Sequence, residues 1–136
     1  MEKIYHFRQL RVYSASVDSS MLIFKLSKQF PPEEKFSLTD QIRRSSRSVA
    51  SNIAEAWGKR RYVAAFVSKL SDSESEAYET QTWIEFAVRC GYVAPEIADE
   101  ISKGYDRIVG QLISMISDAH NWILREDETV YLPEDP

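Results

Sequence analysis

The stretch QIRRSSRSVASNIAEAWGKRR, residues 41–61, predicts most of a long helix, up to a break at Gly58, with one apolar face and one basic face. Ile42, Val49 and Ile53 recur at helical spacing, and serine and alanine occupy many of the positions between them. The segment holds six basic residues against a single acid, Glu55, although the whole chain has a formal charge of −4. At about 100° per residue the first three arginines fall opposite the apolar face, so their positive charge is expected to point outward.

The N-terminal region is expected to form another amphipathic helix over residues 7–28. Its large apolar side chains recur every three or four residues and would share one face: Phe7, Leu10, Tyr13, Val17, Met21 and Phe24. The helix should end before Pro31 and Pro32, since a proline lacks a backbone donor and disfavours helix in the residue before it. The next helix covers residues 38–57 and begins after Ser37, whose hydroxyl can cap free N–H groups.

Two longer helices are expected over residues 62–90 and 96–124. The sequence CGYVAP separates them. Gly91 suits the left-handed position that follows many helices, and Pro95 suits a first helical turn. No segment of the sequence favours a strand.

Four helices with short connections predict an all-α fold, an elongated antiparallel up-and-down four-helix bundle over residues 1–124. An acidic tail, residues 125–136, would follow it. The hydrophobic content of 43% and the charged content of 28% are ordinary for a soluble globular protein. No apolar run approaches the roughly 18 residues of a membrane span, and Cys90 has no second cysteine to pair with. We therefore expect a cytoplasmic protein that contacts no membrane.

The sequence offers no recognisable catalytic or metal-binding motif. Di-iron bundles use Glu-x-x-His pairs, but Lys3 and Ser117 stand three residues before the two histidines, His6 and His120. Cys90 has no neighbouring base and is expected to be a buried small hydrophobe. The sequence AWGKRR has a single glycine and no Ser or Thr after its lysine, unlike a phosphate-binding loop. We expect a protein that is not an enzyme and that needs no metal or cofactor.

Several motifs taken together resemble a known bacterial family. They are LRVY (10–13), FPPEE (30–34), the run QIRRSSRSVxxNIAE (41–55), ETQTW (79–83) and CGY (90–92). Over residues 7–122 the chain resembles the four-helix-bundle proteins encoded within intervening sequences of 23S ribosomal RNA genes. The same fold family includes the accessory variability determinant of diversity-generating retroelements. Ala56 stands where the family pattern has a glycine, so no site of the glycine-bearing members is carried over.

The resemblance implies a homopentamer in which bundles pack side by side around a central channel. It supplies no catalytic residue, and no general biochemical activity is established for the intervening-sequence proteins. The retroelement relatives bind nucleic acid and work with a reverse transcriptase. The candidate partners are therefore further copies of this chain, RNA or DNA, and a reverse transcriptase or other nucleic-acid enzyme.

Three interpretations of the basic residues stay open. They can form a solvated face, a subunit interface with the acids of the third helix on a neighbouring chain, or a phosphate-binding surface. The six residues are named here the basic stripe: Arg43, Arg44, Arg47, Lys59, Arg60 and Arg61. The preferred function is a non-enzymatic homo-oligomer that binds nucleic acid or a nucleoprotein through this stripe. The alternative is a protein-only scaffold in which the same arginines form subunit contacts.

Five other residues are interpreted as structural. Asn52 and Glu55 lie at the edge of the apolar seam, where a polar pair favours a buried hydrogen-bonding network that fixes register over a reactive site. Glu79, Gly91 and Tyr92 belong to the family motifs. Tyr92 is expected to be a core or interface aromatic, because such rings bury a large area.

Overall fold

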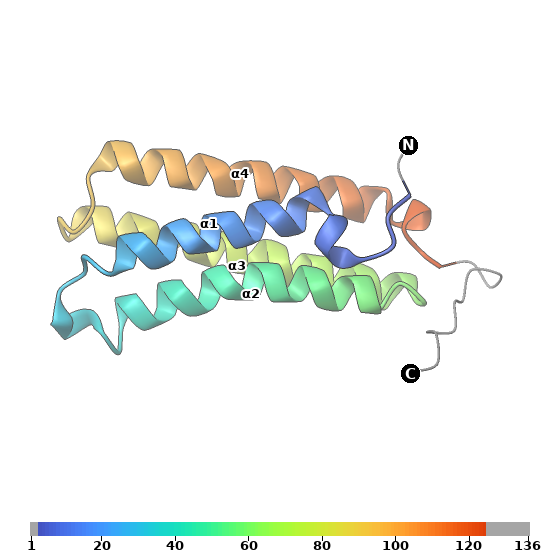
Figure 1. Ribbon diagram of the computed structural model, residues 1–136, viewed down its shortest axis with the longest axis horizontal. Coiled ribbons are helices and arrows are strands. Elements are labelled where there is room, and N and C mark those ends of the chain that lie inside the picture. Colours follow the sequence, from blue (N-terminus) through green and yellow to red (C-terminus); the bar gives the residue numbers. More distant parts are fainter. Residues whose placement is uncertain (1–2, 125–136) are drawn as a thin grey trace.

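The computed structural model describes residues 3–124, and in that part every regular element is a helix (Figure 1). The four long helices are α1 (Arg11–Ser27), α2 (Leu38–Gly58), α3 (Val63–Arg89) and α4 (Pro95–Ser117). The three 3₁₀ turns are η1 (Phe7–Gln9), η2 (Pro32–Glu34) and η3 (Ala119–Asn121). The all-α prediction is confirmed, and the predicted tail lies outside the described residues.

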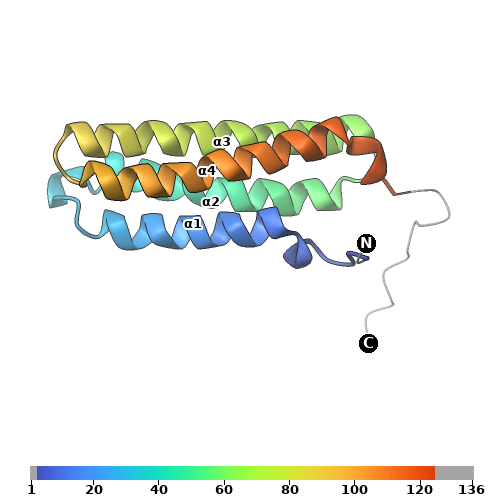
Figure 2. The ribbon, with the colours of Figure 1, turned by 90° about the horizontal axis from the view of Figure 1, so that it is seen from above.

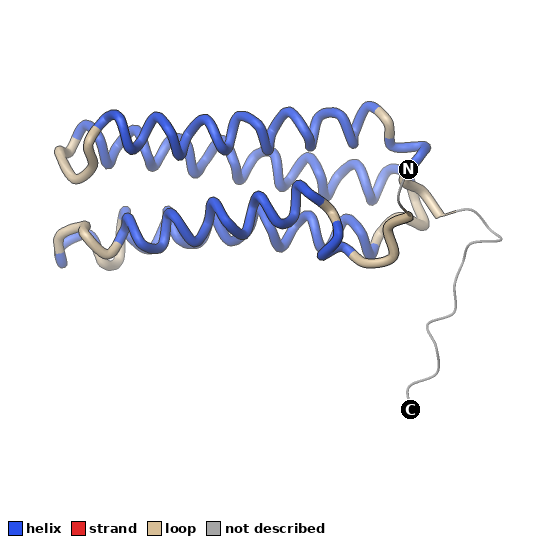
Figure 3. Tube along the Cα trace, turned by 45° about the horizontal axis from the view of Figure 1, so that its top comes forward, coloured by secondary structure: helices blue, strands red, loops and turns tan. Residues whose placement is uncertain are grey.

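Successive long helices run in opposite directions, and their connections alternate between the two ends of the bundle (Figures 1 and 2). Each helix packs against the next one in the chain, and α4 also packs against α1, which closes the bundle. With 27 residues, α3 is about 40 Å long at 1.5 Å per residue, so the bundle is elongated. Figure 3 shows the loops gathered at its two ends. No helix in the described part is both long enough and apolar enough to cross a membrane.

The predicted helix over residues 7–28 is divided in two. His6 and Gln9 cap η1 reciprocally: the Arg8 N–H donates to His6 Nδ1 at 3.2 Å, and the His6 N–H donates to Gln9 Oε1 at 3.0 Å. Leu10 then leaves the helical region and enters the core with 3% of its surface exposed, so α1 begins one residue later. The fourth helix likewise ends at Ser117, because Asp118 leaves helical geometry and η3 follows. The other predicted helix ends agree to within one residue.

The buried face of α1 differs from the predicted one. The predicted seam included Met21, which is 50% exposed. The buried positions are instead Val12, Ser16, Ser19, Ser20, Ile23, Leu26 and Ser27. The spacing of large apolar side chains does not predict this face, because several of its buried residues are serines. The hydroxyls of Ser16, Ser20 and Ser27 find partners inside the bundle, as when Ser16 donates to the Val12 carbonyl at 2.7 Å.

The small residues of α2 serve packing within the chain. Ser46 lies 3.1 Å from Ser20 of α1, Oγ to Oγ. On the other side Thr80 of α3 donates to Ser45 at 2.8 Å, and Ser73 donates to the Val49 carbonyl at 2.7 Å. Side chains this short let α1 and α3 both approach α2 closely. Each of these hydroxyls bonds another hydroxyl or a backbone carbonyl, which avoids the free-energy cost of burying an unpaired polar group.

Two connections meet at the end of the bundle opposite the termini. The Tyr92 hydroxyl, from the α3–α4 connection, donates to the Glu34 carboxylate of η2 at 2.8 Å, and its ring lies 5.7 Å from that of Phe30. Gly91 has a φ of 79°, which confirms the predicted left-handed position. The prediction that Cys90 is buried is wrong: it is exposed where α3 ends, and Val93 occupies the next core position.

Glu34 caps α2. Its carboxylate accepts from the Ser37 hydroxyl at 2.6 Å and from the Leu38 N–H at 3.3 Å, so Ser37 does not cap the helix with its own side chain. The hydrogen bond from Ser37, followed by that from Tyr92, lowers the pKa of Glu34. The same contact raises the pKa of Tyr92 to about 12, because ionising the phenol would remove its donor. The FPPEE and CGY motifs are therefore joined by one charged hydrogen bond.

Replacing Tyr92 with Phe should lower the Tm by a few degrees at pH 7. Because the pKa of Glu34 is lowered from 4.5, its hydrogen bonds stabilise the fold above that pH and lose their effect as pH falls through the folded-state pKa. The difference from wild type should therefore shrink at pH 3 in circular-dichroism melts. Tyr78→Phe is the control, since Tyr78 bonds Glu74 on an exposed turn of one helix. An equal loss at both pH values would contradict the role of the ionised carboxylate.

Candidate nucleic-acid interface

Three cations surround the ring of Phe24 on the surface between α1 and α2. The Lys28 Nζ lies 4.7 Å from the ring centroid, the Arg43 Cζ 4.8 Å and the Arg47 Cζ 5.9 Å. Lys28 follows Phe24 by four residues and caps the C-terminus of α1, and Arg43 and Arg47 are one turn apart on α2. The two helices run side by side in the bundle (Figure 1). We call these four residues the Phe24 cluster.

The position of Arg43 is held by α1. Its Nε donates to the Ser27 hydroxyl at 2.7 Å, and that hydroxyl donates in turn to the Phe24 carbonyl at 2.9 Å. A guanidinium has five N–H donors in a rigid planar fork. The bond to Ser27 uses the inner one, so the two terminal nitrogens remain for an anion.

No carboxylate of residues 3–124 pairs with a cation of the cluster. The ion pairs of the described residues are Lys69–Glu55, Arg89–Glu85 and Lys103–Asp99, and none of them involves Lys28, Arg43 or Arg47. The negative face of the ring attracts each cation, but it carries no net charge. Three like charges so close together repel one another. An anion placed among them would relieve that repulsion and gain charge-assisted hydrogen bonds.

Arg44 points away from the cluster, toward α3. Its positive charge opposes the raised pKa of Glu76, which burial raises most and which Glu79 and Asp72 raise further. Glu79, interpreted from the sequence as a structural motif residue, is half-buried beside Glu76. At least one acid of α3, Glu76, is thus influenced by Arg44 of its own chain.

Lys59, Arg60 and Arg61 lie at the α2–α3 connection. The Arg60 guanidinium is 3.3 Å from the Trp57 ring centroid, and its Nε donates to the Trp57 carbonyl at 2.8 Å. Arg60 also accepts, through its carbonyl, from the Leu124 N–H at 3.0 Å. Twelve residues of helix, about 18 Å at 1.5 Å per residue, separate Lys59 from Arg47. The six predicted residues therefore do not form one continuous surface. Arg43 and Arg47 face α1, and Arg44 faces α3. Lys59, Arg60 and Arg61 lie farther along the bundle, at the α2–α3 connection.

Phe24 and Lys28 are functional candidates that the sequence interpretation missed. Phe24 was assigned to the core seam of the first helix, and Lys28 to that helix's end. The signal that could have found them is their spacing of four residues, which places a cation over an aromatic ring on one helix face. What the sequence alone does not contain is the rotation of α1 that turns Phe24 toward α2.

The predicted buried network of Asn52 and Glu55 is wrong. Asn52 Nδ2 donates to the Ser48 carbonyl of its own helix at 2.9 Å. The Glu55 side chain is 54% exposed and pairs with Lys69 across a distance of 3.5 Å. Glu55 falls just outside the apolar seam, where no helix covers it and water solvates the carboxylate.

Glu55→Ala should therefore change the free energy of unfolding by no more than about 0.5 kcal/mol, the range of an exposed ion pair. Urea unfolding followed by circular dichroism measures it. Lys69→Ala should give the same small change, since both variants remove the same pair. A loss several times larger in either variant would show that the carboxylate is covered, for instance by a second copy of the chain.

Among residues 3–124 no group of three or more His, Cys, Asp or Glu side chains is placed to hold a metal ion.

The family model described as 23S rRNA-intervening sequence protein matches residues 8–114. The chain belongs to this family.

A crystal structure from the S23 ribosomal protein family of Bacteroides thetaiotaomicron is similar to this fold, and its protein is described as having unknown function. The two sequences are 34% identical. The similarity covers 77% of this chain and 97% of that one, with a TM-score of 0.70. A comparison with curated proteins finds no match. The match of the family model confirms the resemblance found in the motifs.

Proposed function

We propose that this protein is a non-enzymatic, homo-oligomeric bundle that binds the phosphate backbone of a nucleic acid through the Phe24 cluster. The observation that supports this most is the cluster's charge: Lys28, Arg43 and Arg47 share one ring, and none of them pairs with a carboxylate of the described residues. Fixed cations at close spacing suit phosphate oxygens, which accept from a guanidinium fork in pairs. Arg44, Lys59 and Arg61 would add weaker contacts elsewhere on the surface.

The geometry favours backbone contact over base readout. The cations already occupy the surroundings of the Phe24 ring, so the ring is not free to stack on a base. Phosphate contacts position a nucleic acid without reading its sequence. Binding should therefore tolerate changes of sequence and depend strongly on salt.

A homo-oligomer would repeat the cluster on every subunit. A chain of phosphates that spans two subunits would then gain affinity through effective concentration, without a new kind of contact. The family resemblance implies a homopentamer. Met21 and Leu22, each 50% exposed on α1, provide apolar surface on which a neighbouring subunit could pack.

Fluorescence anisotropy with labelled RNA and DNA tests the proposal. The wild-type protein should bind at low salt, and log Kd should change linearly with log salt concentration. The slope should be about 0.7 per phosphate contact on single strands and about 0.9 on duplex DNA. No measurable binding to either nucleic acid at low salt would overturn the proposal.

The alternative is a protein-only scaffold in which the same arginines form subunit contacts. The exposed apolar residues favour it: besides Met21 and Leu22, Phe86 is 51% exposed and Ile97 is 52% exposed. Light scattering on the samples used for anisotropy separates the two functions. A scaffold should lose subunits when Arg43, Arg44 and Arg47 are replaced, and it should bind no nucleic acid at any salt concentration.

A further inference from the structure

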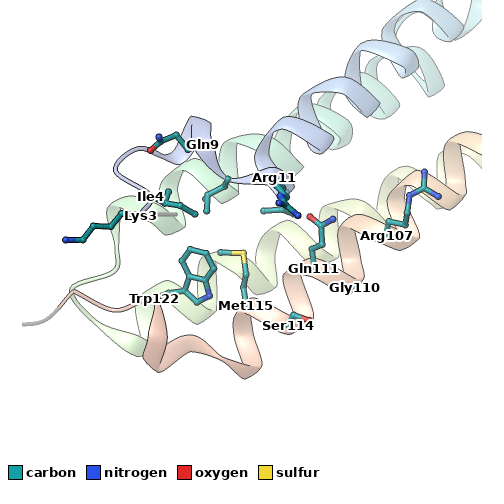
Figure 4. Close-up of a pocket in the computed structure, with 12 residues that line it drawn as sticks. Lys3, Ile4, Gln9, Arg11, Arg107, Gly110, Gln111, Ser114, Met115 and Trp122 are labelled. Atoms are coloured by element: carbon teal, nitrogen blue, oxygen red, sulfur yellow. The ribbon is translucent and has the colours of Figure 1, made fainter. Parts of the chain in front are cut away.

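A cleft of about 910 Å³ opens between the start of α1 and the second half of α4 (Figure 4). Leu10, Val12 and Met115 form part of its apolar floor, with Trp122 and Ile4 facing each other across one end. The cleft lies at the end of the bundle where α4 finishes and the N-terminal segment begins (Figures 1 and 4). It is separate from the Phe24 cluster: Arg11, at its edge, precedes Phe24 by thirteen residues, about 20 Å along a helix.

The charge of the cleft has one sign. Among residues 3–124, Lys3, Arg11 and Arg107 line it, and no acid does. No ion pair of the described residues involves any of the three. An occupant that suits this surface combines carboxylates with a short apolar segment.

The chain itself contains such a segment immediately beyond the described residues. Residues 125–136 read REDETVYLPEDP, with five carboxylates against one arginine. The apolar triplet Val130, Tyr131 and Leu132 lies between two groups of acids. This acidic–apolar–acidic order matches a cleft with an apolar floor and cationic edges.

The position at which residues 125–136 begin, and their length, are also compatible with binding in this cleft. The described chain ends at Leu124, two residues after Trp122, which lines the cleft. The floor runs along α4 from Met115 to Arg107, about 12 Å at 1.5 Å per residue. An extended chain advances about 3.3 Å per residue, so twelve residues reach about 40 Å, enough to turn back and follow α4.

We propose that residues 125–136 dock in this cleft of their own chain. The apolar triplet covers the floor beside Met115 and Trp122, and the acids pair with Arg11, Arg107 and Lys3. Docking holds the most acidic part of the chain at one end of the bundle, where it does not compete for the cations of the Phe24 cluster.

Chymotrypsin cleavage of the full-length protein after Tyr131, followed by intact mass spectrometry, tests this docking. A docked tail protects the bond, so the wild type should be cleaved at least tenfold more slowly than the double variant Arg11→Glu/Arg107→Glu. Both arginines are exposed, so the variant should fold, and a circular-dichroism melt checks this. The control Lys25→Glu/Lys35→Glu changes the net charge equally at exposed sites outside the cleft and should keep the protection.

A reciprocal change separates pairing from an unspecific effect of charge. Replacing Glu126, Asp127 and Glu128 with Lys in the Arg11→Glu/Arg107→Glu background should restore protection at least in part. Equal cleavage of the wild type and the double variant would overturn the proposal. Protection that rises with protein concentration would also overturn it, because the cleft would then hold the tail of a second copy.

Discussion

Replacing Lys28, Arg43 and Arg47 together with alanine should weaken binding to single-stranded RNA by roughly 100-fold at 0.1 M salt. Each lost phosphate contact removes about 0.7 from the log–log salt slope, which corresponds to a factor of about five in Kd at this concentration. Three contacts therefore account for both the loss of affinity and a slope that is flatter by about 2. Anisotropy titrations at several salt concentrations measure the two quantities together.

A matched control removes the same charge elsewhere. Lys35, Arg89 and Lys103 are exposed and lie outside the cluster. Their triple replacement with alanine should change Kd by less than about threefold, because none of the three belongs to the Phe24 cluster and salt screens exposed charges that do not contact the phosphates. Equal losses in both triple variants would show that net charge, and not the cluster, sets the affinity.

The ring has its own test. Phe24→Leu keeps all three cations and most of the apolar area, but it removes the negative face that holds them, worth about 0.5–1 kcal/mol for each exposed cation. The expected loss of affinity is at least about two- to fivefold, which corresponds to the contribution of a single cation, with an unchanged salt slope. A flatter slope in this variant would contradict the expectation, because it would mean that the cations no longer reach the phosphates once the ring is removed.

The fold was predictable from the sequence because its main signals are local. The prolines after α1, Gly58 and the CGY motif mark the helix ends, and the Ile42, Val49 and Ile53 seam marks the buried face of α2. Prediction failed where a tertiary contact decided the outcome. Ser20 is buried because α2 approaches it closely, and a count of apolar residues gives no weight to serine.

The candidate site was predictable only in part, for the same reason. Arg43 and Arg47 were identified by their charge and by their place on the outer face of α2. Their shared partner on α1, Phe24, was not identified, since its position depends on how α1 is rotated against α2. At Glu55 the sequence interpretation predicted a tertiary contact that the fold does not make. A residue at the edge of a helical seam can be buried or exposed, and the Glu55 side chain is exposed.

The spacing of α1 and α2 connects the fold to the site. Ser46 is 1% exposed, and its hydroxyl lies 3.1 Å from that of Ser20. It stands beside Arg47 in the sequence and one turn after Arg43, whose carbonyl accepts its hydrogen bond at 3.1 Å. The closeness of the two helices at this point is what lets arginines from α2 reach a ring on α1.

Ser46→Leu should therefore destabilise the bundle by about 3 kcal/mol, since the larger side chain forces the helices apart and strands the Ser20 hydroxyl. The expected drop in Tm is roughly 10 °C. Ser46→Ala separates the causes, because it removes the hydrogen bond without adding volume and should cost only about 1 kcal/mol. Ser51→Leu, at an exposed position of the same helix, is the matched control and should cost less than about 0.5 kcal/mol.

The same substitution should also weaken nucleic-acid binding, although it removes no charge. At a temperature where Ser46→Leu is still folded, widening the gap between α1 and α2 takes Arg43 and Arg47 away from Phe24 and from the Ser27 hydroxyl. Affinity should fall several-fold for Ser46→Leu and stay unchanged for Ser51→Leu. If Ser46→Leu keeps the Tm and the affinity of the wild type, the small residues of α2 do not set the spacing of α1 and α2. The Phe24 cluster would then form without that close spacing.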